Sequence, residues 1–545
     1  MRRLAGAGAR AKGPFSRGIA TAWEYAAERY PDQRTAGDRP PDIDPDRDIA
    51  TFSDQAQFVR EVASWLREGG VESGDRVAII KANHSDIVAL SCAAARIGAV
   101  PAQIACTHSP EVARELLARL DRPVLVTDRA RMESCGLGSD EVAKLVKRII
   151  VVDAEPGSNG STTALADLRG GSIPPLTPRP DDEAMVITHT SGTTGTPKLV
   201  AHSAATLRAL SAVESKRWPV LGLKGGDSVL FCDPFVHGRV FTGLAAVTKN
   251  GPRLTMLSDP VAPNVRDLLV EHRPTVIETV PNAFLLWEAM ADDPGEPFRD
   301  VRLFINTFDA VNVRSVRTLL NASKRRFPLW VQGWGQTEAG PVTLGIYTRR
   351  SVRDRGGRMP ATRKVGRPVP FITKVRAVDP DTGRPLGRGR AGLIEVHKRG
   401  CALGYVGEDD RFQSKRNDGW WNMGDLGVVS RTNEVQLLDR EVDRIDEGSC
   451  LELEDVLLDR MPSLVEAVML AVNGGPPLPV LNMADGQPLD PDAWKRAVAD
   501  LPELADPVVL PWSDVPRTAT WKVQRQKLRE QVAPGTEPVG SGRWT

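Results

Sequence analysis

The sequence predicts an α/β fold, with a large, multilayered N-terminal domain followed by a small α+β C-terminal domain. Between Phe58 and Arg179, amphipathic helical stretches alternate with short apolar runs, the pattern of parallel strands connected by helices. Beyond Arg349 the segments become shorter and richer in β-type residues. The chain of 545 residues also exceeds what one hydrophobic core usually supports.

The alternation of apolar and amphipathic segments places the individual elements. We expect a helix over residues 58–67 and strands over 77–80, 124–127, 149–152, 229–232, 275–280 and 303–305. The longest apolar stretch, 87–106, is interrupted by Arg96 and Pro101, so it predicts a buried helix followed by a strand and not a membrane span. Turn residues separate the later strands, which are expected over 371–378, 392–396 and 427–430.

The change of pattern along the chain also sets the domain boundaries. We assign residues 19–439 to the N-terminal domain and residues 440–545 to the C-terminal domain. Residues 1–18 carry five basic side chains and no acid: Arg2, Arg3, Arg10, Lys12 and Arg17. This composition predicts a disordered tail, with an organelle transit peptide as the alternative.

Charge and cysteine content exclude several classes of partner. The 71 Lys and Arg residues nearly cancel the 70 Asp and Glu residues, so no overall field would attract nucleic acid or an anionic membrane. An anionic substrate must therefore be held by local contacts. The six cysteines fall singly, without a CxxC pair or metal-ligand spacing, which favours a cytoplasmic location.

A loop suited to phosphate follows an apolar strand at 185–189. Its residues are Thr190, Ser191, Gly192, Thr193, Thr194, Gly195, Thr196, Pro197 and Lys198, and a helix-like segment then extends to about Arg217. Glycines let the backbone approach a polyphosphate, hydroxyl and N–H groups donate to its oxygens, and Lys198 adds a positive charge. The spacing is not that of GxxxxGK[ST], so a P-loop fold does not follow. The loop predicts a site for the phosphates of ATP.

Two later segments carry groups that suit a nucleotide and its metal. In the run Trp334, Gly335, Gln336, Thr337 and Glu338, the aromatic ring can cover adenine and Thr337 can donate to a phosphate. Glu338 offers the hard oxygen ligand that Mg²⁺ prefers. In the segment 419–427, Asp425 can accept hydrogen bonds from both hydroxyls of a ribose.

These motifs, together with Pro516-Arg517-Thr518 and Lys522-x-x-Arg525 near the C-terminus, resemble those of the adenylate-forming superfamily of acyl-CoA synthetases, adenylation domains and luciferases. The likeness covers about residues 20–530 and is closest in type to a stand-alone acyl-CoA synthetase. It implies ATP- and Mg²⁺-dependent activation of a small carboxylic acid to acyl-AMP, with release of pyrophosphate and transfer of the acyl group to CoA.

The resemblance also assigns roles to further residues. It places Asp309 beside the adenine, and it places Arg440 at the ribose, at the junction with the C-terminal domain. It implies that the mobile C-terminal domain carries Lys522 into the active site, where its charge would stabilise the transition state. The implied acid pocket contains Phe235, His237, Val280 and Phe284. No acidic residue occupies 235–240, which disfavours an α-amino acid. The implied pocket is mainly apolar, which suits an aryl or aliphatic acid.

The chain departs from the superfamily pattern at several positions. Relatives carry glycine where this chain has Leu199 and Trp521, and a glycine pair where it has residues 307–310. The segment 445–457 differs from that of thioester-forming relatives, so transfer of the acyl group to an amine or a carrier protein is an alternative to CoA. A catalytically inactive nucleotide-binding protein is a third possibility. The sequence leaves open the acid, the acceptor and the oligomeric state.

Overall fold

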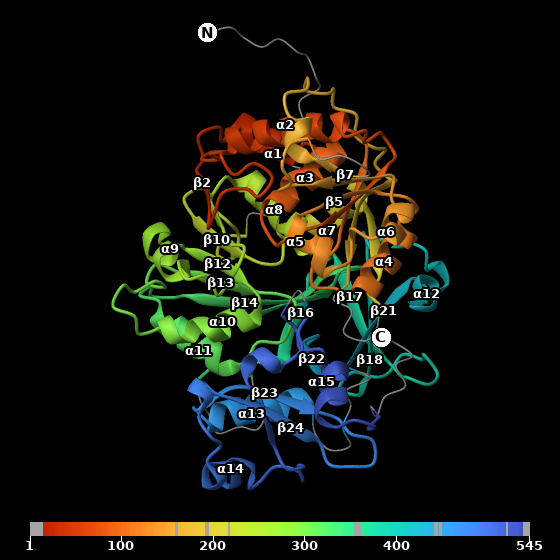
Figure 1. The fold of residues 1–545 in the computed structure, drawn as a ribbon. Helices are drawn as coiled ribbons and strands as arrows, with labels where there is room; N and C mark the ends of the chain where they lie inside the picture. Colours follow the sequence, from red (N-terminus) through yellow and green to blue (C-terminus); the bar gives the residue numbers. More distant parts are fainter. Residues whose placement is uncertain are drawn as a thin grey trace.

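The structure is a computed structural model that describes residues 13, 15–157, 162–190, 196–215, 218–353, 361–440, 445, 449–518 and 521–537. Two large sheets and one small sheet organise these residues. Figure 1 shows α1 (Ala22–Arg29), α2 (Phe52–Glu68) and α3 (Asp86–Arg96) at one end of the molecule and the C-terminal elements at the other. The predicted α/β architecture with a smaller C-terminal part is confirmed.

The first large sheet is mostly parallel. In the described part of the chain its order is β19 (Gly404–Tyr405), β9 (Leu199–Ser203), β8 (Ala184–His189), β4 (Val100–Gln103), β3 (Arg76–Ile80), β5 (Val124–Thr127), β6 (Arg148–Val151) and β7 (Thr162–Ala164). Apolar residues of one face pack with α4 (Pro110–Arg119) and α6 (Asp140–Leu145), while α5 (Arg129–Ser134) follows β5. Ser109 caps α4 and Pro110 occupies its first turn, which fixes where that helix begins.

The second large sheet is parallel in one half and antiparallel in the other. Its parallel half runs β14 (Leu329–Gln336), β13 (Leu303–Asn306), β12 (Val276–Thr279), β10 (Ser228–Cys232), β11 (Arg253–Met256) and β2 (Thr35–Gly37). Its antiparallel half runs β15 (Gly340–Tyr347), β16 (Lys364–Pro368), β22 (Val435–Arg440), β21 (Trp420–Val429), β18 (Ala391–Lys398) and β17 (Thr373–Val378), with β20 (Arg416–Asn417) beside β21. Helices α9 (Val265–His272), α10 (Pro281–Trp287) and α11 (Val313–Ala322) cover the parallel half, and α12 (Asp409–Ser414) follows β19.

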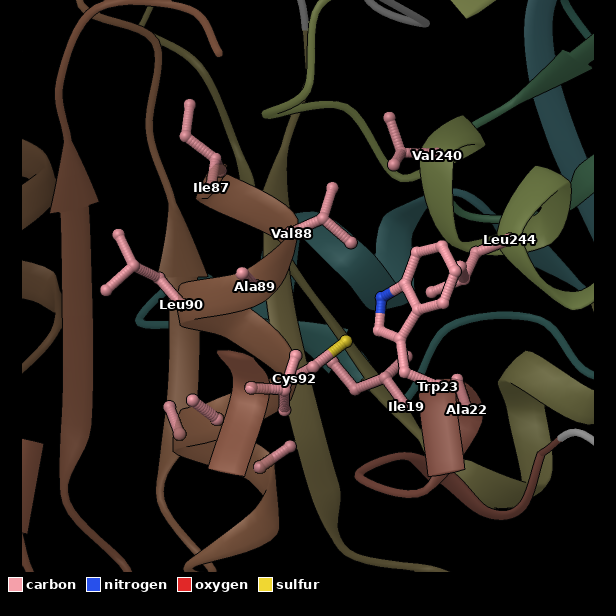
Figure 2. Close-up of a cluster of buried hydrophobic side chains, with 14 of the residues drawn as sticks. Ile19, Ala22, Trp23, Ile87, Val88, Ala89, Leu90, Cys92, Val240 and Leu244 are labelled. Atoms are coloured by element: carbon pink, nitrogen blue, oxygen red, sulfur yellow. The ribbon is translucent and has the colours of Figure 1, made fainter. Parts of the chain in front are cut away.

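The main core lies between the two large sheets. Figure 2 shows Trp23 of α1 facing Val240 and Leu244 of α8 (Arg239–Asn250), with Val88 and Cys92 of α3 on its other side. All five side chains are buried. Because this core draws on both sheets, it fixes the relative position of the loops at their edges, where the site residues lie.

The C-terminal part has its own sheet of β23 (Leu464–Leu470), β24 (Leu478–Met483) and β25 (Val508–Val509), with α13 (Cys450–Arg460), α14 (Pro491–Val498) and α15 (Arg525–Val532). Arg314 of α11 donates to the carbonyl of Leu464 at 2.8 Å, and Arg363 pairs with Asp455 at 2.8 Å. These contacts dock the C-terminal part against the rest of the chain. A domain boundary at residue 440 stays a prediction.

Two expectations differ from the structure. The segment after Lys198 is not helical at once, because Leu199–Ser203 forms β9 against β8 before α7 (Ala204–Ser211) begins. Ser203 and Thr206 form a capping box that sets this later start. Much of the predicted tail lies outside the described residues, yet Phe15 is buried and Ser16–Ile19 forms β1. In the part of the chain that the structure describes, no helix is both long and apolar enough to span a bilayer.

Candidate active site

A cavity of about 160 Å³ lies where the phosphate loop, the hairpin of β14 and β15, the start of α8 and the C-terminal part meet. We call it the main cavity. Its wall includes Thr190, Lys198, Thr337, Glu338, His237 and Lys522. Residues separated by more than 300 positions in the sequence therefore share one site, as the motifs predict.

The phosphate loop is the connection between two antiparallel strands. His189 of β8 pairs with Leu199 of β9, and the N–H of Thr190 donates to the carbonyl of Lys198 at 3.0 Å. The N–H of Lys198 donates in turn to Thr190 Oγ1 at 3.1 Å. Ser191, Gly192, Thr193, Thr194 and Gly195 lie outside the described residues, so the structure places the two ends of the predicted loop at the main cavity.

Glu338 and the lysine of this loop both lie near Tyr405. Its side chain is 4% exposed, and Oε1 accepts a hydrogen bond from the hydroxyl of Tyr405 at 2.5 Å. Lys198 Nζ lies 5.7 Å from the centroid of the Tyr405 ring. Since Arg411 and Lys415 also line the cavity, cationic side chains surround the place where phosphate oxygens would lie.

The segment that holds Trp334 is fixed on β21. Trp334 donates its indole N–H to Asp425 Oδ2 at 3.3 Å, and Trp421 donates to Gln336 Oε1 at 3.1 Å. A Cβ atom at Gly335 would lie 2.1 Å from the carbonyl oxygen of Gly340, so the tight β14–β15 hairpin requires glycine there.

A larger cavity of about 470 Å³ adjoins the main cavity between the N-terminal and C-terminal parts. Asp309, Trp334, Asp425 and Lys522 line it. Asp425 and Arg440 are directly opposed across the β21–β22 pair, although the side chain of Arg440 lies outside the described part. Three of the predicted adenine and ribose residues, Asp309, Trp334 and Asp425, thus share one cavity that has room for a nucleoside.

His237 lines the main cavity. Its Nδ1 accepts a hydrogen bond from the backbone N–H of Arg239 at 3.1 Å, so in the neutral ring Nε2 carries the proton. Burial, with the charges of Lys522 and Arg239 nearby, lowers the pKa of His237 to about 3. His237 is therefore an uncharged N–H donor, and its ring lies 4.4 Å from that of Phe308.

An ion cluster that the sequence did not reveal borders the main cavity. Arg239 donates through Nε and Nη2 to the two carboxyl oxygens of Glu278, at 2.6 and 2.9 Å, and through Nη1 to Glu214 and Thr242. Burial raises the pKa of Glu278, although the guanidinium opposes that shift. This polar cluster makes the cavity less apolar than the sequence suggested.

Lys522 reaches both cavities from the C-terminal part. Its loop is held by the N–H of Thr518 donating to the carbonyl of Lys522 at 2.8 Å, and by Asn282 donating to the carbonyl of Trp521 at 2.6 Å. Trp521 has φ +62° and Phe308 has φ +75°. The superfamily pattern has glycine at the position of Trp521 and a glycine pair within 307–310, the segment that contains Phe308. Glycine adopts this left-handed conformation without strain.

The other predicted pocket residues lie elsewhere. Val280 lines a third cavity of about 140 Å³. Phe235 is buried in the main core, and Phe284 is fully buried among Trp287, Phe304 and Trp330. Arg239 and Asp233, which line cavities, and Tyr405, which contacts Glu338, were missed because each takes its importance from neighbours distant in the sequence.

The fold and the site define an adenylate-forming enzyme, a class in which ATP is bound. The profile described as AMP-binding enzyme matches residues 23–406, and the chain belongs to this family of adenylating ligases. It is 39% identical to 3-amino-2-hydroxy-4-methoxybenzoate diazotase of Streptomyces cremeus over 503 residues, covering 88% of this chain and 89% of the relative.

Two further comparisons give the range of the family. The chain is 26% identical to 4-coumarate–CoA ligase 2 of Oryza sativa subsp. japonica, covering 89% of this chain and 88% of the relative. The amide bond synthetase McbA from Marinactinospora thermotolerans superposes with a TM-score of 0.73 at 21% identity, covering 94% of this chain and 99% of that structure. The latter similarity shows the fold alone.

Proposed function

We propose that this chain is an ATP-dependent diazotase, which adenylates nitrite and passes it to an aromatic amine. The observation that carries this proposal is the small main cavity, whose wall brings together a neutral N–H donor, a lysine and the two ends of the phosphate loop. The 39% identity to a diazotase, against 26% to a CoA ligase, supports the choice of acceptor.

The size of the cavity favours a small oxyanion. An apolar cavity of about 150 Å³ is filled by one benzene molecule. The main cavity measures about 160 Å³ and includes the phosphate-loop residues, so the reacting phosphate must share this space with the second substrate. Nitrite, with three heavy atoms, fits the remainder. His237 Nε2–H and the ammonium of Lys522 would hold its oxygens.

Adenylation would begin with attack of a nitrite oxygen on the α-phosphorus of ATP. The new O–P bond displaces pyrophosphate and leaves a mixed anhydride of nitrous acid and AMP. Negative charge grows on the α-phosphate oxygens, and Lys522 would stabilise it. Glu338 and Thr337 fit a magnesium ion through their oxygens, and the bound ion would neutralise phosphate charge.

Transfer to the amine then requires no external oxidant. The amine nitrogen attacks the nitrogen of the anhydride, AMP leaves with the bonding electron pair of the N–O bond, and the amine loses a proton. The resulting N-nitroso compound takes up one proton and loses water to give the diazonium ion. Nitrite already has the oxidation level that the second nitrogen of a diazo group needs.

The test combines the enzyme with Mg·ATP, ¹⁵N-nitrite and a panel of aminohydroxybenzoates. We expect pyrophosphate release that depends on nitrite, and a diazonium product that couples to a naphthol and carries ¹⁵N in its terminal position. A reaction without enzyme at the same neutral pH is the control. Pyrophosphate release that does not depend on nitrite but does depend on a carboxylic acid would contradict the proposal.

A second candidate keeps the same adenylation site with a small carboxylic acid as substrate. The acyl-AMP would then pass to CoA, to an amine or to a carrier protein, and the similarity to a 4-coumarate–CoA ligase supports CoA. Offering the acid panel with each acceptor separates these outcomes. Residues 446–448, in the segment that departs from thioester-forming relatives, lie outside the described residues. Absence of turnover with every substrate would indicate an inactive nucleotide-binding protein.

A further inference from the structure

We propose that the aromatic amine binds in the third cavity, with Asp233 accepting a hydrogen bond from its amino group. This inference rests on the proposed diazotase function. The cavity, called here the Asp233 cavity, measures about 140 Å³, and its wall includes Asn83, Cys106, Asp233, Val236, Val280 and Trp521.

Asp233 is a buried acid whose carboxyl group makes no hydrogen bond within the described part of the chain. It follows β10 directly, is 2% exposed, and neither of its carboxyl oxygens has a hydrogen-bond partner among the described residues. By contrast, Asp227 at the other end of the same strand pairs with Arg302 at 2.6 Å. A buried polar group without a partner is costly, so its persistence beside a cavity points to a ligand that supplies the missing donor.

The charge state of Asp233 suits an uncharged amine. Burial raises the pKa of Asp233 well above its ordinary value, and nearby Glu278 adds to this effect while Arg239 opposes it. A neutral carboxyl group still accepts a hydrogen bond through its carbonyl oxygen. It does not attract an ammonium ion as a carboxylate would. The cavity therefore favours the neutral amine, which is the nucleophilic form.

The walls and the volume suit a single aromatic ring. Pro234, Val236 and Val280 provide apolar surface, and the indole of Trp521 provides an aromatic surface. A volume of about 140 Å³ is close to the roughly 150 Å³ that holds one benzene molecule. One ring with one hydrogen-bond donor thus matches the cavity in both size and polarity.

The Asp233 cavity lies next to the proposed nitrite site. Val236 and Trp521 line the Asp233 cavity, whereas His237 and Lys522, the next residue in each case, line the main cavity. The amine would therefore contact Val236 and Trp521, which directly precede His237 and Lys522, the two residues that would hold the oxyanion. Because Trp521 and Lys522 are adjacent, one loop of the C-terminal part contributes to the walls of both cavities.

The kinetic test replaces Asp233 with leucine, which has a similar shape and cannot accept a hydrogen bond. For Asp233→Leu we expect the KM for 3-aminobenzoate to rise at least tenfold, with a change of less than twofold in the KM for nitrite. Val280→Phe fills the cavity from another wall and should raise the same KM even if Asp233→Leu does not fold. The control Asp227→Asn alters the acid at the other end of β10 and should not raise it.

Direct binding separates this inference from the proposed function. Calorimetry should show that aniline binds the wild-type enzyme more tightly than benzene does, and that Asp233→Leu abolishes the difference. That result would support the amine site even if nitrite proved not to be the substrate. Equal binding of aniline and benzene to the wild type, or an unchanged amine KM in both cavity variants, would overturn the inference.

Discussion

The hydroxyl of Tyr405 donates a hydrogen bond to Glu338 Oε1 at 2.5 Å, and Lys198 Nζ lies 5.7 Å from the centre of the same aromatic ring. Tyr405 lies on β19, which pairs with β9 directly after the phosphate loop. One tyrosine therefore connects the expected metal ligand to the lysine of the phosphate loop. The position of Glu338 depends on a residue that is 67 positions away in the sequence.

Tyr405→Phe should weaken the use of Mg·ATP. Loss of a hydrogen bond to a charged group costs about 1.5–3 kcal/mol, so the KM for Mg·ATP should rise at least about tenfold. Pyrophosphate release measured against magnesium concentration checks this. The matched control is Tyr347→Phe, because Tyr347 donates to Gln332 at 3.1 Å in the core and should affect stability alone. An unchanged magnesium dependence in Tyr405→Phe would contradict the role of Glu338 as a metal ligand.

Lys522→Ala should lower the rate of adenylate formation by about 10²- to 10³-fold, the usual effect of losing one preorganised transition-state donor. The loss should appear in kcat more than in the KM for ATP, since the contacts form mainly in the transition state. Lys527→Ala, which removes an exposed lysine of α15, is the control. Near-normal adenylation by Lys522→Ala would show that another cation stabilises the α-phosphate.

Much of the fold could be predicted because buried parallel strands are apolar runs of characteristic length. The predicted strand 124–127 coincides with β5, and 303–305 falls within β13. The residues 199–203 were harder to assign, since their burial on both sides gives no alternation and a short apolar run also fits a helix. Pairing with β8, which decides the outcome, is a tertiary contact.

Only those residues of the candidate site that belong to a recognisable sequence motif could be predicted. Thr190, Lys198, Glu338 and Lys522 belong to motifs, and the structure brings them to one cavity. Phe284 lies close to a motif but faces the core, because an aromatic residue alone does not reveal which side of its helix is buried. Asp233 could not be predicted from the sequence, because what distinguishes it is that its carboxyl oxygens have no hydrogen-bond partner in the described structure.

Acidification should destabilise the protein through His202. Burial lowers the pKa of His202 to about 4, and its Nε2–H donates to the carbonyl of Thr337 at 2.9 Å. Between pH 6.5 and 4 the unfolded chain binds a proton at this histidine and the folded chain does not, so stability falls as the pH is lowered.

The contribution of His202 is about 1.4 kcal/mol per pH unit within that window. His202→Gln keeps an N–H donor without titrating, so its free energy of unfolding should depend less steeply on pH than that of the wild type. Urea unfolding at several pH values between 4 and 7 measures both slopes. Parallel curves for the two proteins would mean that another group accounts for the acid sensitivity.

Backbone strain at Trp521 can be isolated by comparing two substitutions. Trp521→Ala and Trp521→Gly both remove the indole, and so both lose its contacts equally. Only glycine adopts the observed φ of +62° without strain, whereas alanine retains the cost of a left-handed residue. Trp521→Gly should therefore be more stable than Trp521→Ala by about 1 kcal/mol, measured by urea unfolding.

The matched pair Val523→Ala and Val523→Gly, at a position without positive φ, should show the opposite order, because glycine gains more entropy on unfolding. If Trp521→Gly were less stable than Trp521→Ala, the backbone at residue 521 would not be strained in solution. The bulk of the indole would then be the remaining difference from relatives that have glycine at this position.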